Sequence, residues 1–323
     1  MRKRLAIIVP LIGLAAFAGL YSLPYYSIGP GPAREVAPLI EVTGHPRYPS
    51  QGRFVMTSIT FRQVTALGAF LAWLDPVRAV VPESDLFTPG ETKEQEQRRS
   101  ISQMDQSKID AVHVVLSLLA DYPDERGRGA LVESVVSGCS AAGRLYPGDV
   151  ILEIDGDPIG DRADASAAID AAASGETLSF EVRADGETEE VDLVKRPCGE
   201  EEEVLVGVSL LDNFPFGVSI ASGDIGGPSA GLMWALGLYD LLTPRDLTGG
   251  RTIAGTGQID LDGTIYPIGG IGEKILAAGW ADADVILVPR DNLEEARAAG
   301  DFGIELVPVS TFQEALDYLG SAA

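Results

Sequence analysis

The sequence is poor in histidine, lysine and cysteine, and it lacks balance between acidic and basic residues. Its 323 residues include two His, five Lys and two Cys, and the formal net charge is -24. A carboxylate excess of this size repels phosphates, which excludes nucleic acid as a partner. Two cysteines are too few for a disulfide framework and show no metal-ligand spacing, so no metal site is predicted. A reaction that needs a neutral base near pH 7 therefore has few residues to draw on.

The N-terminus carries a charge pattern typical of an exported chain. The basic residues 2–4 precede an uncharged run, 5–24, which ends beside the tyrosines at 25 and 26. About 20 apolar residues suffice to cross a ~30 Å hydrocarbon core. Residues 1–26 are therefore predicted to form a transmembrane anchor with a short cytoplasmic basic tail, which leaves the rest of the chain extracytoplasmic at the cell membrane. The alternative is a cleaved signal peptide, because residues 16–18 (AFA) match a cleavage site.

The middle of the chain resembles a PDZ domain of the kind found in bacterial proteases. The resemblance rests on residues 145–151 (LYPGDVI) and 154–159 (IDGDPI), and the predicted domain is 127–197. It implies a module that binds extended protein or peptide chains by adding a strand to a sheet edge. By analogy, the peptide-binding loop is expected at Gly129, Ala130 and Leu131.

The segment 223–242 (GDIGGPSAGLMWALGLYDLL) is the first of two that can carry chemistry. A glycine-rich turn leads through Pro228 into an apolar helix whose first residues include Ser229. Unpaired N–H groups and the positive dipole end of a helix stabilise an oxyanion. Ser229 is therefore a candidate nucleophile. A helix N-cap is the alternative, because serine is common at that position.

The second segment, 254–280, places Lys274 at the start of an alanine-rich helix between apolar neighbours. Desolvation lowers the pKa of a lysine and makes it a neutral base, which arginine cannot become. Alternatively, the lysine stem lies along the helix with its amine in water.

Together these segments resemble the peptidase domain of the Lon family, which uses a Ser-Lys dyad. The matching motifs occur in order: PSAG at 228–231, TG at 256–257, PIGGI at 267–271, EKILAAG at 273–279 and ILVPRDN at 286–292. The resemblance implies Ser229 as nucleophile and Lys274 as base, with Thr256 bonded to the lysine and with Gly227 and Pro228 in support. One departure is Gly226, because Lon proteases often carry an acidic residue three positions before the serine, and Asp224 cannot be assumed to replace it.

No P-loop sequence accompanies these motifs, so no nucleotide and no cofactor are expected. The combination resembles the membrane-bound PDZ-Lon serine proteases of Gram-positive bacteria, the YlbL-like family. It implies an α+β fold: a Lon-type peptidase domain (ribosomal S5 domain 2-like) with an inserted PDZ domain and an N-terminal transmembrane helix. The strands and helix that precede the PDZ segment assign 33–125 and 200–323 to the peptidase domain.

The predicted function is an ATP-independent serine endopeptidase that degrades exported or membrane-associated proteins captured by the PDZ domain; a homo-oligomer is possible. The alternative is a membrane-anchored PDZ scaffold with an inactive Lon-like fold. A trypsin-like enzyme finds no support, because neither His45 nor His113 lies in a suitable motif. In an oxidising setting, a bridge between Cys139 and Cys198 is one possible outcome.

Overall fold

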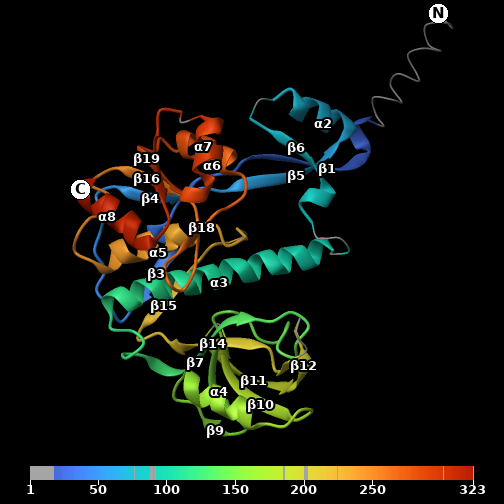
Figure 1. The fold of residues 1–323 in the computed structure, drawn as a ribbon, viewed down its shortest axis with the longest axis vertical. Helices are drawn as coiled ribbons and strands as arrows, with labels where there is room; N and C mark the ends of the chain where they lie inside the picture. Colours follow the sequence, from blue (N-terminus) through green and yellow to red (C-terminus); the bar gives the residue numbers. More distant parts are fainter. Residues whose placement is uncertain are drawn as a thin grey trace, which may run out of the picture.

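The computed structural model describes residues 18–322 except 76, 88, 89, 91, 185, 200–202, 224 and 301. Three parts are evident in Figure 1. We call them the central body (31–58, 93–126 and 214–322), the second body (127–213) and the projecting sheet (18–30 and 59–85). The central body is thus assembled from segments on both sides of the second body in the sequence.

A five-stranded sheet organises the central body. Its order is β2-β4-β16-β19-β20, and all neighbouring pairs are parallel except β2 with β4. The strands are β2 (Arg34–Glu35), β4 (Arg53–Met56), β16 (Thr252–Gly255), β19 (Val285–Pro289) and β20 (Glu305–Val309). Strand side chains alternate between faces. Hence Ile253 and Leu287 join one hydrophobic cluster, whereas Ala254 and Ile286 join another.

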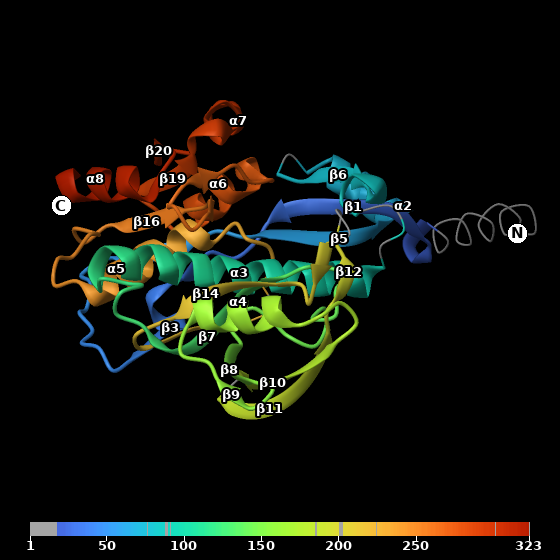
Figure 2. The same ribbon diagram turned by 60° about the horizontal axis from the view of Figure 1, so that its bottom comes forward.

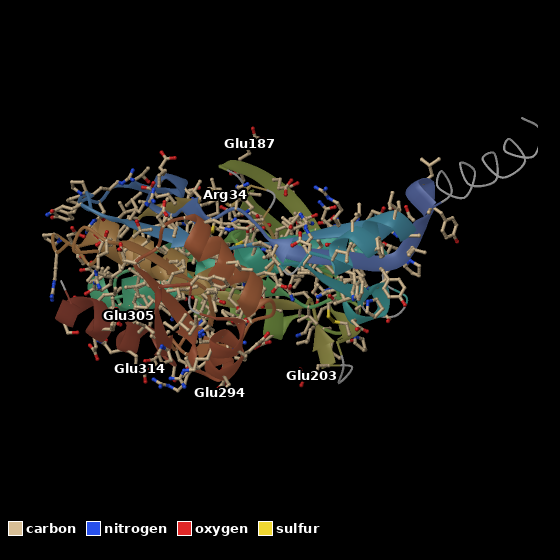
Figure 3. All side chains as sticks on the ribbon, turned by 90° about the horizontal axis from the view of Figure 1, so that it is seen from above. Arg34, Glu187, Glu203, Glu294, Glu305 and Glu314 are labelled. Carbon is tan, nitrogen blue, oxygen red and sulfur yellow. A yellow bond between two sulfur atoms is a disulfide. The ribbon has the colours of Figure 1, made fainter. Side chains whose placement is uncertain are left out.

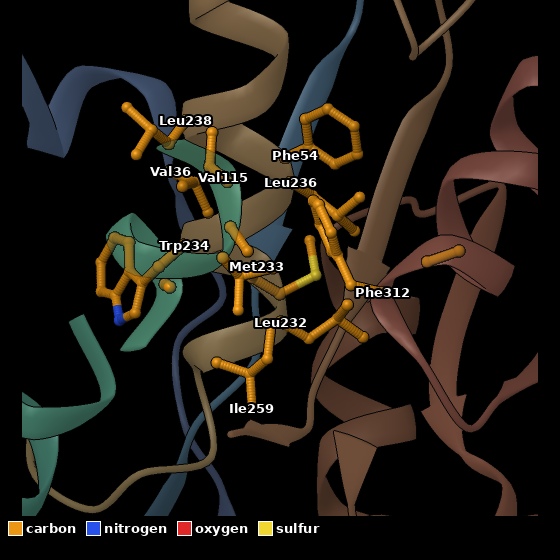
Figure 4. Close-up of a cluster of buried hydrophobic side chains, with 14 of the residues drawn as sticks. Val36, Phe54, Val115, Leu232, Met233, Trp234, Leu236, Leu238, Ile259 and Phe312 are labelled. Carbon is orange, nitrogen blue, oxygen red and sulfur yellow. The ribbon is translucent and has the colours of Figure 1, made fainter. Parts of the chain in front are cut away.

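Helices cover both faces of this sheet. One face packs against α3 (Lys93–Leu119), α5 (Gly231–Leu242) and α8 (Phe312–Ala322), and the other against α6 (Ile271–Trp280) and α7 (Leu293–Ala299). Helix α5 is apolar around nearly its whole circumference, as expected of a helix buried inside a protein. Figure 4 shows Trp234, Met233 and Leu236 of α5 packed with Val115 of α3 and Phe54 of β4.

Smaller elements complete the central body. These are η1 (Ala37–Leu39), the pair β3 (Ile40–Thr43) with β15 (Gly217–Ile220), the pair β17 (Gln258–Ile259) with β18 (Ile265–Tyr266), and η3 (Arg290–Asn292). Residues from before and after the second body share one core, which includes Val36 and Val115 as well as Leu232 and Phe312. The segment before the second body is therefore structurally part of the central body.

The second body is a sheet with its own core. The order is β11-β10-β8-β7-β14, formed by β11 (Glu187–Val194), β10 (Thr177–Ala184), β8 (Val150–Ile154), β7 (Gly127–Val135) and β14 (Val208–Asn213). Helix α4 (Arg162–Ala171) packs on it, β9 (Asp157–Pro158) pairs with β8, and β12 (Arg196–Cys198) pairs with β13 (Glu203–Leu205). Strand β14 pairs with β7, so residues up to 213 belong here, beyond the predicted boundary at 200.

Helix α3 lies between the central and second bodies (Figures 1 and 2). Its N-terminus is fixed by a capping box, in which Thr92 and Gln95 exchange side-chain-to-backbone bonds. At its middle, Ile109 packs with Leu131 and Val150 of the second body, and Gln106 Nε2 donates to Glu133 Oε1 at 2.6 Å. One helix therefore contacts both bodies.

The projecting sheet has the order β5-β1-β6, formed by β5 (Ile59–Thr65), β1 (Ser22–Pro30) and β6 (Ala79–Pro82). It carries α2 (Ala66–Trp73) at its far end and is followed by η2 (Glu83–Asp85). Within the described residues, no helix has the length and apolar character to cross a membrane. The first 17 residues, which hold most of the predicted span, lie outside this range. The predicted end at 26 requires correction, because residues 22–26 pair as strand β1 with its neighbours.

Cys139 and Cys198 form a disulfide within the second body. The bridge closes a loop over a sequence separation of 59. In the chain-entropy account, a loop of this length destabilises the unfolded state by about 4 kcal/mol.

We expect a Cys139→Ser, Cys198→Ser double variant to lose about 2–4 kcal/mol of the unfolding free energy of the second body. Hydrogen exchange in β8 and β10 measures the loss. The three tryptophans at 73, 234 and 280 lie outside this body, so their urea-unfolding transition serves as an internal control. Unchanged exchange in both strands would contradict the assigned role of the bridge.

Candidate active site

Ser229 lies in the turn that leads into α5, not within the helix. The N-cap of α5 is Ala230, which makes no side-chain capping bond, so the serine hydroxyl is not used as a helix cap. The Ser229 carbonyl accepts hydrogen bonds from Thr256 Oγ1 at 2.9 Å and from the Gly257 N–H at 2.8 Å. Thr256 and Gly257 therefore fix the backbone of Ser229, and Ser229 lines the cavity described below.

Lys274 lies in the first turn of α6, whose N-cap, Gly270, has the left-handed backbone that glycine favours (φ 69°). The lysine is only 3% exposed. Its Nζ lies 2.9 Å from Ser229 Oγ and 3.0 Å from Thr256 Oγ1. The structure thus brings together three residues that are 18 to 45 positions apart in the sequence.

The electrostatics of Lys274 follow from its burial. No carboxylate pairs with its amine among the residues that the structure describes. Burial therefore acts uncompensated and lowers the pKa of Lys274 to about 8. A substantial neutral fraction close to neutral pH is what a general base requires.

The turn before Ser229 rests on α3. The Gly227 N–H donates to the Ser100 carbonyl at 2.8 Å, and Ser107 Oγ donates to the Pro228 carbonyl at 2.9 Å. A Cβ atom at Gly226 would collide with the Ser100 side chain. This contact explains the missing acidic residue: helix α3 occupies the space that a side chain at 226 would need. Asp224, the nearest acidic residue, lies outside the described residues.

A cavity of about 740 Å³ opens in front of the serine and lysine, and both residues line it. Much of the remaining wall is apolar: Met56, Ile59, Phe61, Ile101, Met104 and Ile268. The backbone N–H groups of Ser229 and Ala230 donate to no acceptor within the described part of the chain. The site therefore combines a hydroxyl, a buried amine and two unpaired N–H donors at the wall of an apolar cavity.

Gly129, Ala130 and Leu131 do not lie where a peptide can add. They belong to β7, which is flanked by β8 on one side and β14 on the other. This corrects the predicted peptide-binding position. A central strand has no unpaired backbone edge to offer.

The free sheet edge beside α4 belongs to β14. Residues 205–208 (LVGV) lead into this strand, and Gly207 has positive φ (91°). The carbonyls of Val206 and Gly207 accept from the Ala141 and Val136 N–H groups, whereas their own N–H groups have no acceptor among the described residues. In the sequence, this loop is marked by a glycine between apolar residues just before a strand. The predicted PDZ domain ends at residue 197 and therefore does not include the loop.

Comparisons with known proteins agree with this geometry. Residues 208–319 match the Lon protease (S16) C-terminal proteolytic domain, and residues 101–194 match a PDZ domain. Lon protease 2 of Bacillus subtilis is 39% identical over 105 residues, which is 32% of this chain and 18% of that protein. Lon protease 1 of Sorangium cellulosum is 43% identical over 93 residues, which is 28% of this chain and 11% of that protein.

The chain therefore matches less than a fifth of the length of these curated relatives. Among solved structures, the PDZ domain of the SdrC-like protein from Listeria innocua is 26% identical, covering 25% of this chain and 92% of that one at a TM-score of 0.24.

The region 208–319, which matches the Lon proteolytic domain, contains Ser229, Thr256 and Lys274. The chain therefore combines a region similar to that domain with a region similar to a PDZ domain.

The Lys274 amine should set the pH dependence of any reaction at this site. Because its pKa is lowered to about 8, half of the amine is neutral at that pH, and well below it the neutral fraction falls about tenfold per pH unit. We expect kcat/KM on a fluorogenic peptide to follow this neutral fraction, with a midpoint near pH 8 and a plateau above about pH 9. A flat profile between about pH 6 and pH 9 would exclude Lys274 as the titrating base.

A Thr256→Val variant tests, in the same assay, whether the Thr256 hydroxyl positions the Lys274 amine or whether the side chain only fills space. The change keeps the side-chain shape and removes the Lys274 Nζ to Thr256 Oγ1 bond, which favours the ammonium form. The maximal rate should fall while the midpoint of the profile moves to lower pH. Thr256→Ser is the matched control and should restore both values.

Proposed function

We propose that this protein is an ATP-independent serine endopeptidase that acts on exported or membrane-associated proteins. The single observation that carries the proposal is the 2.9 Å separation between Ser229 Oγ and a lysine amine that is almost fully buried. Nucleophile and base in hydrogen-bond reach, with the base oriented by a third group, are the requirements for acyl transfer.

The reaction follows from these positions. Neutral Lys274 accepts the Ser229 proton while Oγ attacks the peptide carbonyl carbon, and the Thr256 hydroxyl keeps the amine aligned. The resulting oxyanion is stabilised by the N–H groups of Ser229 and Ala230. The lysine ammonium then protonates the leaving amine, which releases one product and leaves an ester on Ser229. Neutral again, the lysine deprotonates a water that hydrolyses the ester.

Peptide capture is assigned to the free edge of β14. An incoming chain that adds to this edge gains main-chain hydrogen bonds, and the unpaired N–H groups of Val206 and Gly207 suit a terminal carboxylate. Helix α3 links this edge to the active site. Its Ile109 packs in one hydrophobic cluster with Leu131 of β7 and Leu211 of β14, and its Ser107 holds the turn before the serine.

Membrane attachment through the uncharged segment that precedes β1 belongs to the same proposal and rests on the sequence. Basic residues at 2–4 precede the uncharged run, which favours a cytoplasmic N-terminus and an extracytoplasmic peptidase. The rival function, a scaffold with an inactive Lon-like fold, does not require the buried amine beside the hydroxyl. A buried lysine without a carboxylate partner is costly, which favours the enzyme.

We expect Ser229→Ala and Lys274→Arg each to abolish peptide hydrolysis without unfolding the protein. The first removes the nucleophile, and the second replaces the base with a group that stays protonated. Adding ATP or a metal chelator should leave the wild-type rate unchanged. Substantial activity in Lys274→Arg, or a requirement for ATP, would refute the mechanism.

Excision of the second body tests the role of peptide capture. Gly127 and Asn213 are paired neighbours at its base, so a short Gly/Ser linker can join residues 126 and 214. The shortened protein should hydrolyse a short peptide at near the wild-type rate but lose most activity on a full-length unfolded substrate. Equal losses on both substrates would show that the second body supports the active site itself. The Ser229→Ala variant of the shortened protein is the control for hydrolysis that does not depend on this serine.

A further inference from the structure

The end of the projecting sheet exposes an unusual number of large apolar side chains. In and beside α2, Leu67, Phe70, Leu71, Trp73 and Leu74 are between 48% and 74% exposed, and only Ala72 of the helix is buried. No charged residue occurs between Arg62 and Asp75. A helix that is apolar on all sides is normally buried or in lipid. We call this set of five residues the apolar tip.

The apolar tip adjoins the point where the N-terminal segment enters the structure. Ser22, the first residue of β1, pairs with Thr65, which is the N-cap of α2. Exposed Leu20 and Tyr25 flank that pair. The uncharged run that begins at residue 5 therefore leads directly to the base of α2. The uncharged stretch that leads into β1 and the uncharged stretch of α2 therefore adjoin one another at the same end of the projecting sheet.

The apolar tip itself carries no charge, although the projecting sheet does. Glu83 and Asp85 lie in η2 of that sheet's segment, whereas Glu294, Glu305 and Glu314 lie on the central body (Figure 3). Near the tip, Asp75 is paired with Arg78 at 3.1 Å. An apolar surface of this kind, with tryptophan and phenylalanine at its outer side, suits the boundary between headgroups and acyl chains.

We propose that the apolar tip inserts into the outer surface of the lipid bilayer in which the segment before β1 is anchored. This inference rests on the proposed membrane attachment, and it adds a second contact that fixes the orientation of the protein. The occupant is lipid because the tip is continuous with the predicted anchor. A second copy of the chain and a polypeptide substrate are the competing occupants.

The experiment uses the full chain reconstituted in phosphatidylcholine vesicles that contain brominated lipid, which quenches tryptophan at the acyl boundary. Trp73 is 74% exposed and Trp280, on α6, is 64% exposed, so the two residues form a matched pair. Both variants also retain Trp234, which is 0% exposed and contributes the same buried background to each. Above that background, emission from Trp280→Phe, which retains Trp73, should be quenched and shifted to shorter wavelength. Trp73→Phe, which retains Trp280, should show neither change.

Each other outcome overturns the inference in a distinguishable way. A chain that floats with the vesicles while Trp73 stays unquenched is anchored without a lipid-embedded tip. A chain that does not float refutes the attachment as well, and peptide hydrolysis still tests the peptidase independently. Shielding of Trp73 only in nanodiscs that hold two chains identifies a dimer contact, and shielding only on addition of an unfolded substrate identifies a substrate contact.

Discussion

The structure depends on keeping one lysine amine away from water and from any carboxylate. Lowering the pKa of Lys274 from 10.5 to about 8 corresponds to roughly 3 kcal/mol against the charged form. The enclosure is made by helices on opposite faces of one sheet. Helices α5 and α6 both begin near the end of β16, where Thr256 follows the strand, so serine, threonine and lysine meet at the carboxyl end of the central strand.

Helix α3 gives the molecule its second constraint. Its Ser100 and Ser107 hold the turn before the nucleophile, and its Ile109 packs against the second body. Near this contact, burial raises the pKa of the Asp110 carboxyl to about 8, so the group is mostly neutral at pH 7. The second body therefore packs against the same helix that supports the active-site turn.

The site was predictable from sequence because its parts are short segments with strong local signals. Ser229 follows a glycine turn, and Lys274 lies among apolar residues at a helix start. What depended on strand pairing was not predictable: β4 and β5 follow one another closely in the sequence but join different sheets, and β14 pairs with β7 of a distant segment. Local pattern identifies a strand but not its neighbour.

Strand β5 has a consequence for substrate reach. It begins at Ile59, in the wall of the active-site cavity, and ends at Thr65, where the apolar tip starts. Seven residues of strand span about 23 Å. With the tip in lipid, the length of β5 sets the distance between the bilayer and the active site. A tethered substrate must then extend about seven residues from the bilayer before a peptide bond reaches Ser229. If the proposed lipid contact holds, chains folded tightly against the membrane would be spared and chains with a loose stalk would be exposed to cleavage.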